Sequence, residues 1–60
     1  MKATELRKKL ENEGFVNIRT DKHHKYRHPD GRTTMVPKGR KEIGLGLLKA
    51  IERQTQVKLI

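Results

Sequence analysis

The sequence predicts an α+β fold with the order helix, strand, strand, strand, helix (α-β-β-β-α). Apolar residues recur at helical spacing near both ends of the chain, and three short strand-like stretches lie between them. The links between these stretches are short and carry turn residues, as hairpins require. We therefore expect a three-stranded antiparallel sheet with both helices on one face and the other face open.

The first helix is expected to begin at Thr4 as N-cap and to end near Glu13. Its apolar spacing runs up to Leu10, and Gly14 suits the left-handed conformation that ends many helices. Phe15 then falls where a Schellman motif places an apolar contact back to Leu10.

The strands are expected at residues 15–20, 23–28 and 33–37. Residues 21–22 form a short turn, and residues 29–32, Pro-Asp-Gly-Arg, form another, because Pro fixes φ and Gly tolerates a positive φ.

The second helix is expected to begin between Gly44 and Gly46, since Leu47, Leu48 and Ile51 share one side of a helix. The apolar tail, residues 57–60, either packs on the sheet or meets a partner.

Length and charge restrict the class of protein. The 60 residues allow one domain, 1–60, with a thin core, and 15 Lys and Arg against 7 Asp and Glu give a net charge of +8. This charge favours a polyanionic partner, either nucleic acid or an acidic protein. The chain has no Cys, so disulfides and thiolate zinc sites are excluded. No apolar run is long enough to span a membrane, and a cytoplasmic location is the default expectation.

Alternate side chains of the second strand point to opposite faces of the sheet. One face therefore carries His23, Lys25 and Arg27, and the other carries His24, Tyr26 and His28. If Tyr26 faces the helices, the first set forms a cationic surface on the open face. A bulge that shifts the register by one residue would exchange the faces, and so the roles, of the two neighbouring histidines.

Six stretches of the chain together carry a resemblance to a known family: residues 1–6, 14–15, 23–32, 36–37, 41–43 and 46–51. They resemble the HicA family of toxins over nearly the whole chain. The resemblance implies a fold like the double-stranded-RNA-binding domain and a metal-independent ribonuclease that cleaves mRNA and so inhibits translation and growth. It also implies one catalytic histidine, a HicB-type antitoxin that covers it, and no cofactor.

In the family, the catalytic histidine follows a Gly-Ser pair at the head of the second strand. His23 matches this position, but Asp21-Lys22 replaces the pair and the turn is one residue shorter, so His24 is the second candidate. The family often has His at the position of Lys38 and Gly at the position of Gln56.

The chemistry agrees with the resemblance. A histidine with a pKa near 6.5 suits proton transfer with the 2′-hydroxyl or the leaving oxygen, and nearby cations stabilise the developing charge on phosphorus. His24 and His28 share a face but stand about 13 Å apart at ~3.3 Å per residue, so they do not act together, and the alternating faces disfavour a metal site. The expected RNA-binding residues are Lys22, Lys25, Arg27, Lys38, Arg40 and Lys41.

Two other functions remain open. A non-catalytic double-stranded-RNA-binding module would use the same fold to read shape through phosphate and 2′-hydroxyl contacts. A basic structural or regulatory nucleic-acid partner would cause no growth arrest when expressed.

Overall fold

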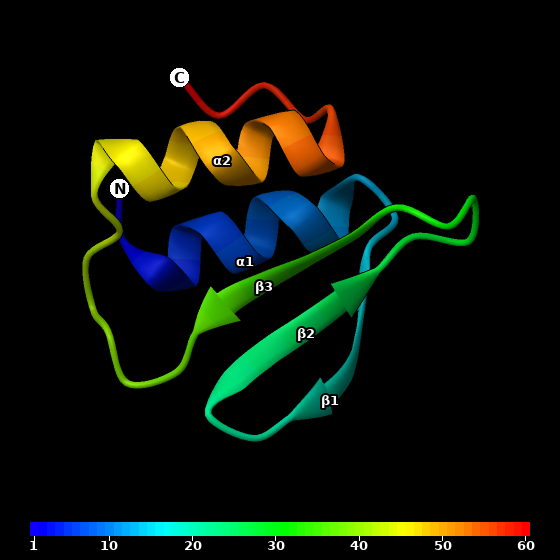
Figure 1. Ribbon diagram of the computed structural model, residues 1–60, viewed down its shortest axis with the longest axis horizontal. Coiled ribbons are helices and arrows are strands. Elements are labelled where there is room, and N and C mark those ends of the chain that lie inside the picture. The colour runs from blue at the N-terminus through cyan, green and yellow to red at the C-terminus, as the bar shows by residue number, and fades with distance from the viewer.

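In the computed structural model, which describes residues 1–60, two helices cover one face of a three-stranded antiparallel sheet (Figure 1). The strand order is β1-β2-β3, so the predicted α-β-β-β-α fold is confirmed. Neither helix has the length and apolar character needed to cross a membrane. The elements are α1 (Ala3–Asn12), β1 (Val16–Thr20), β2 (His23–Arg27), β3 (Thr33–Pro37) and α2 (Leu45–Thr55).

The start of α1 differs from the prediction. The N-cap is Lys2, whose side chain makes no capping hydrogen bond, and not Thr4. The reason is a contact distant in sequence: Lys2 is extended and forms an antiparallel bridge with Glu42. The backbone N–H of Ala3 donates to the carbonyl of Lys41 at 2.9 Å. This carbonyl satisfies a free N–H of the first turn, so no capping side chain is needed there.

The end of α1 is the predicted Schellman motif. Gly14 has φ +96°, the N–H of Phe15 donates to Leu10 O at 3.0 Å, and the N–H of Gly14 donates to Glu11 O at 3.1 Å. A Cβ at Gly14 would also lie 3.0 Å from Nε2 of His28, a tight contact that adds to the conformational reason for glycine here. Phe15 belongs to this motif, and β1 therefore begins one residue later than expected.

Strand β1 contains a β-bulge. Asn17 pairs with Tyr26 and Arg19 pairs with Lys25, which leaves Ile18 without a partner. Strands β2 and β3 pair without any shift from His23 to Arg27. The bulge therefore lies in β1, and the two neighbouring histidines point to the faces that regular alternation along β2 predicts.

The core lies between the helices and the covered sheet face. Tyr26 is fully buried, and its hydroxyl accepts from Arg7 Nε at 2.8 Å and donates to Glu11 at 2.9 Å. Tyr26 thus faces the helices, as expected, and Lys25 and Arg27 are exposed on the other face. The core residues are Ala3, Leu6, Leu10, Phe15, Tyr26, Val36, Ile43, Leu48, Ile51, Val57 and Leu59.

The tail contributes to the hydrophobic core, whereas the sequence left open whether it packs on the sheet or meets a partner. Val57 and Leu59 are buried in the core, and the Glu52 carboxylate accepts from the backbone N–H groups of Leu59 at 2.6 Å and Ile60 at 3.1 Å. Gln56 adopts the left-handed conformation, φ 62°, and ends α2 without a glycine.

Candidate nucleic-acid interface

The open face of the sheet combines positive charge with exposed apolar side chains. Val16, Ile18 and Met35 are 57%, 51% and 53% exposed, because both helices cover the opposite face. We use "open face" for these three residues together with the exposed polar set of β1 and β2. That set consists of Arg19, His23, Lys25 and Arg27.

His23 is exposed and lies where two shallow hollows of the surface meet. One hollow lies on the open face and is lined by Lys25, Met35 and Arg19, with the turn residues Asp21 and Lys22 at its end. The other continues from His23 and Lys25 around the edge of β3 to side chains of α2. Those side chains are Leu47, Ile51 and Gln54.

Arg19 was missed by the sequence analysis. Regular alternation along β1 would place it on the same face as Asn17, but the bulge at Ile18 sets it opposite Lys25 on the open face. There it forms an ion pair with Asp21, Nε to Oδ2, at 2.6 Å. No residue typical of bulges, such as a glycine, marks this position in the sequence.

His24 lies on the helix side of β2, away from His23. It is half-buried, and its Nδ1 lies 3.1 Å from Oγ1 of Thr20. Burial lowers the pKa of His24 below its ordinary value of 6.5, and the positive charges of Arg7 and Lys38 lower it further. Its imidazole is therefore predominantly neutral near pH 7.

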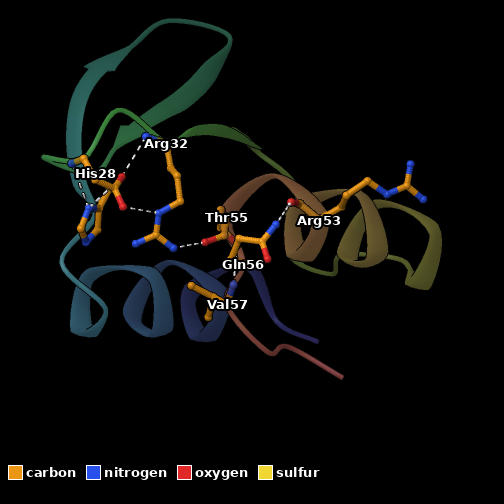
Figure 2. Close-up of polar contacts among 7 residues, drawn as sticks. His28, Arg32, Arg53, Thr55, Gln56 and Val57 are labelled. Carbon is orange, nitrogen blue, oxygen red and sulfur yellow. Dashed lines mark hydrogen bonds and ion pairs between the residues drawn. The ribbon is translucent and has the colours of Figure 1, made fainter.

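His28 has a structural environment. Its ring meets Phe15 edge-on with centroids 5.1 Å apart, and its Nδ1 lies 3.0 Å from an oxygen of Asp30. Arg32 also pairs with Asp30, at 2.8 Å, and its guanidinium lies over the Phe15 ring. Figure 2 shows the Arg32 guanidinium donating to the carbonyl of Thr55 at the end of α2. These five residues form the His28 cluster.

All six expected RNA-binding residues are exposed. Lys25 and Arg27 share the open face with His23. The N–H of Lys38 donates to Lys22 O at 3.2 Å, so these two lysines adjoin at the end of the sheet. Arg40 and Lys41 lie farther along the loop between β3 and α2. No group of three or more His, Cys, Asp or Glu side chains is placed to hold a metal ion.

Together these features define a small basic α+β domain with an exposed, cationic sheet face. The model of the HicA toxin of bacterial toxin-antitoxin systems matches residues 3–57, a range that includes every helix and strand. The chain therefore belongs to the HicA toxin family, as its sequence predicted. Searches of curated proteins and of solved structures gave no match. Membership of this family implies an antitoxin as partner.

Proposed function

We propose that this protein is a metal-independent endoribonuclease that cleaves mRNA and thereby inhibits translation and growth. Its membership of the HicA toxin family supports the role of toxin. The observation that carries the nuclease is the position of His23: exposed, at the head of β2, and between Lys22 and Lys25, for which no ion pair is found. A titratable group among free cations suits an attack on a phosphodiester.

In this scheme, His23 takes the proton of a ribose 2′-hydroxyl while that oxygen attacks the adjacent phosphorus. The bond from phosphorus to the 5′-oxygen breaks, which gives a 2′,3′-cyclic phosphate and a 5′-hydroxyl. Water supplies the proton that the leaving oxygen takes up, and the hydroxide formed in this way removes the proton from the His23 imidazolium, so that the imidazole is regenerated. Lys25 lies two residues after His23 on the same face of the strand. Its ammonium stabilises the additional negative charge on the phosphoryl oxygens.

The partner proposed for the open face is a HicB-type antitoxin that covers His23. Val16, Ile18 and Met35 would supply apolar contact area, and the surrounding cations would attract an acidic protein. The same charges bind RNA, so the antitoxin and RNA would exclude each other from this face.

The test is RNA cleavage by the purified wild type, His23→Ala and His24→Ala, alongside growth of cells that express each variant. We expect His23→Ala to lower the cleavage rate at saturating RNA by roughly 10²- to 10⁴-fold and to relieve growth arrest. His24→Ala should retain most of that rate. A folded His23→Ala protein that cleaves like the wild type would contradict the proposal. If the wild type binds double-stranded RNA but cleaves none, it is instead a non-catalytic RNA-binding module.

A further inference from the structure

The β1 bulge organises a chain of hydrogen bonds that ends on His24. Asn17 Oδ1 accepts from the backbone N–H of Arg19 at 3.2 Å, on the far side of the unpaired Ile18. This contact orients the Asn17 amide, so that Nδ2 donates to Oγ1 of Thr20 at 3.1 Å. The bulge thus favours the orientation of the Asn17 amide in which Nδ2 is the atom nearer to Thr20 Oγ1.

The Thr20 hydroxyl then has one proton to donate. Two acceptors lie within its reach: Nδ1 of His24 at 3.1 Å, and Asn17 Oδ1 at 3.4 Å, which also accepts from Arg19. The shorter contact favours the tautomer of His24 in which Nδ1 accepts from Thr20. A neutral imidazole that accepts at Nδ1 carries its proton on Nε2. In this tautomer, His24 presents the N–H of Nε2 to its surroundings as a donor.

Two cations flank this donor on the helix side of β2. Arg7 is anchored through Nε to Tyr26, two residues along the strand from His24 and on the same face. On the other side, His24 pairs with Val36, and Lys38 lies two residues beyond Val36. Cross-strand diagonal neighbours of this kind lie within reach of long side chains. The terminal nitrogens of Arg7 and the Lys38 ammonium make no hydrogen bond or ion pair within the chain.

The guanidinium of Arg7 and the ammonium of Lys38 both lie close enough to the His24 ring for their charges to act on it, and neither is paired with a carboxylate. Glu11, which lies on the same side, accepts a hydrogen bond from the Tyr26 hydroxyl. This arrangement matches an oxyanion with several acceptor oxygens. It is contiguous with His23, which lies one residue away on the opposite face of the same strand.

We propose that Arg7, His24 and Lys38 bind a backbone phosphate of the RNA next to the phosphate cleaved at His23. The site rests on the proposed function, because RNA is its occupant. The RNA strand then crosses the end of the sheet, over residues 21–22 and 37–38, with consecutive phosphates on its two sides. An RNA backbone suits this path better than a folded acidic protein, because it offers phosphates at regular intervals around a narrow edge. His24 is a phosphate-binding residue in this assignment, and Thr20 and Asn17 are positioning residues.

The first experiment measures binding and not cleavage. Fluorescence anisotropy with a single-stranded 2′-O-methyl oligonucleotide, which lacks the attacking hydroxyl, gives Kd over a range of salt concentrations. We expect Lys38→Gln to raise Kd about tenfold at low salt and to reduce the slope of log K against log salt by about 0.7, the value for one lost phosphate contact. The matched control is Lys49→Gln on α2, an exposed lysine with the same loss of charge, which should stay within about twofold.

A second pair of variants tests the positioning role of Thr20. Thr20→Val removes the hydroxyl while conserving shape, and Thr20→Ser restores it. Nitrogen NMR should show the Nε2–H tautomer of His24 in the wild type and Thr20→Ser, and a mixture of tautomers in Thr20→Val. The affinity for the oligonucleotide should fall in Thr20→Val and recover in Thr20→Ser.

Three results would overturn the site. Lys38→Gln could match Lys49→Gln in Kd and salt slope while the wild type still cleaves RNA, which would leave the nuclease proposal intact. Lys38→Gln could bind the oligonucleotide normally but lose affinity for polyglutamate, which would assign the surface to an acidic protein. A wild type that neither binds nor cleaves RNA would remove this site and the proposed function together.

Discussion

The two ends of strand β2 are built in opposite ways. Beyond its C-terminal end, the polar groups of the His28 cluster are paired with one another or with the end of α2, and Phe15 is buried beneath them. At its N-terminal end, His23 is exposed and Lys25 has no ion-pair partner. A five-residue strand thus separates groups that hold the domain together from groups that remain available to a ligand. Substitutions at the two ends should accordingly separate stability from activity.

Phe15→Ala should have the largest effect on stability. Phe15 is 2% exposed and contacts both His28 and Arg32, so its truncation should cost about 3–5 kcal/mol. For a domain of this size that is a large part of the total, and we expect a largely unfolded chain. Urea denaturation followed by circular dichroism measures the loss, with Phe15→Leu as a milder control. A cooperative transition at the wild-type midpoint would show that the closed end is not what holds the domain together.

Tyr26→Phe, in the middle of β2, should have a smaller effect. The substitution keeps the ring in the core but removes the hydroxyl that links Arg7 to Glu11. A net loss of about 1–2 kcal/mol is expected, because both side chains lose a partner in a partly buried place. Thermal unfolding at neutral pH checks this value. Since Arg7 also loses its anchor beside His24, RNA affinity should fall as well, and unchanged affinity would mean that Arg7 needs no such support.

The closed end should also give the domain an acid-dependent component of stability. The backbone N–H of Arg32 donates to Asp30 and, with the Arg32 guanidinium, lowers the pKa of that carboxyl. A pKa lower in the folded state than in the unfolded chain contributes stability above the unfolded value, about 3.9, which is lost as the pH falls through the folded value. Urea midpoints between pH 7 and pH 2.5 should fall less steeply for Asp30→Asn. If the urea midpoints of the wild type and Asp30→Asn fall in parallel as the pH is lowered, Asp30 makes no such contribution to stability.

His23→Ala should have the smallest effect on stability, within about 0.5 kcal/mol of the wild type, because the side chain is exposed and makes no hydrogen bond within the chain. The same urea experiment measures it. If the N-terminal end of β2 serves a ligand and not stability, His23→Ala should lose cleavage while its free energy of unfolding stays unchanged. A loss of stability comparable to that of Tyr26→Phe would show that the open end is structural too.

Much of the fold was predictable because its determinants are local. Leu10, Gly14 and Phe15 predicted the Schellman motif, and the single Tyr predicted which face of β2 is buried. The N-cap was wrong, since Thr4 has the right chemistry but Lys41, distant in sequence, supplies the acceptor that determines where the helix begins. The end of α2 was not predictable in the same way, because Gln56 adopts the left-handed conformation and no glycine marks this position in the sequence.

The site was predictable only in part, for a different reason. Alternation along β2 placed His23 and His24 on opposite faces, as observed. The neighbours of His24 come from β1 and from the helix and loop on either side, and the position of Thr20 opposite His24 depends on a bulge with no sequence signature. The face to which a side chain points follows from the periodicity of its own strand. A contact between separate strands depends on their register, which a single sequence does not specify at each residue.

The bulge has a consequence for how the chain can vary in length. Because Ile18 has no partner, its deletion would leave Asn17 opposite Tyr26 and Arg19 opposite Lys25, now in a regular ladder with every side chain still on its own face. Deleting any residue of β2 would instead turn the following side chains over. Strand β1 can therefore lose a residue at this one position with its sheet intact, although the contact from Asn17 to the Arg19 N–H, and with it the orientation of His24, would be lost.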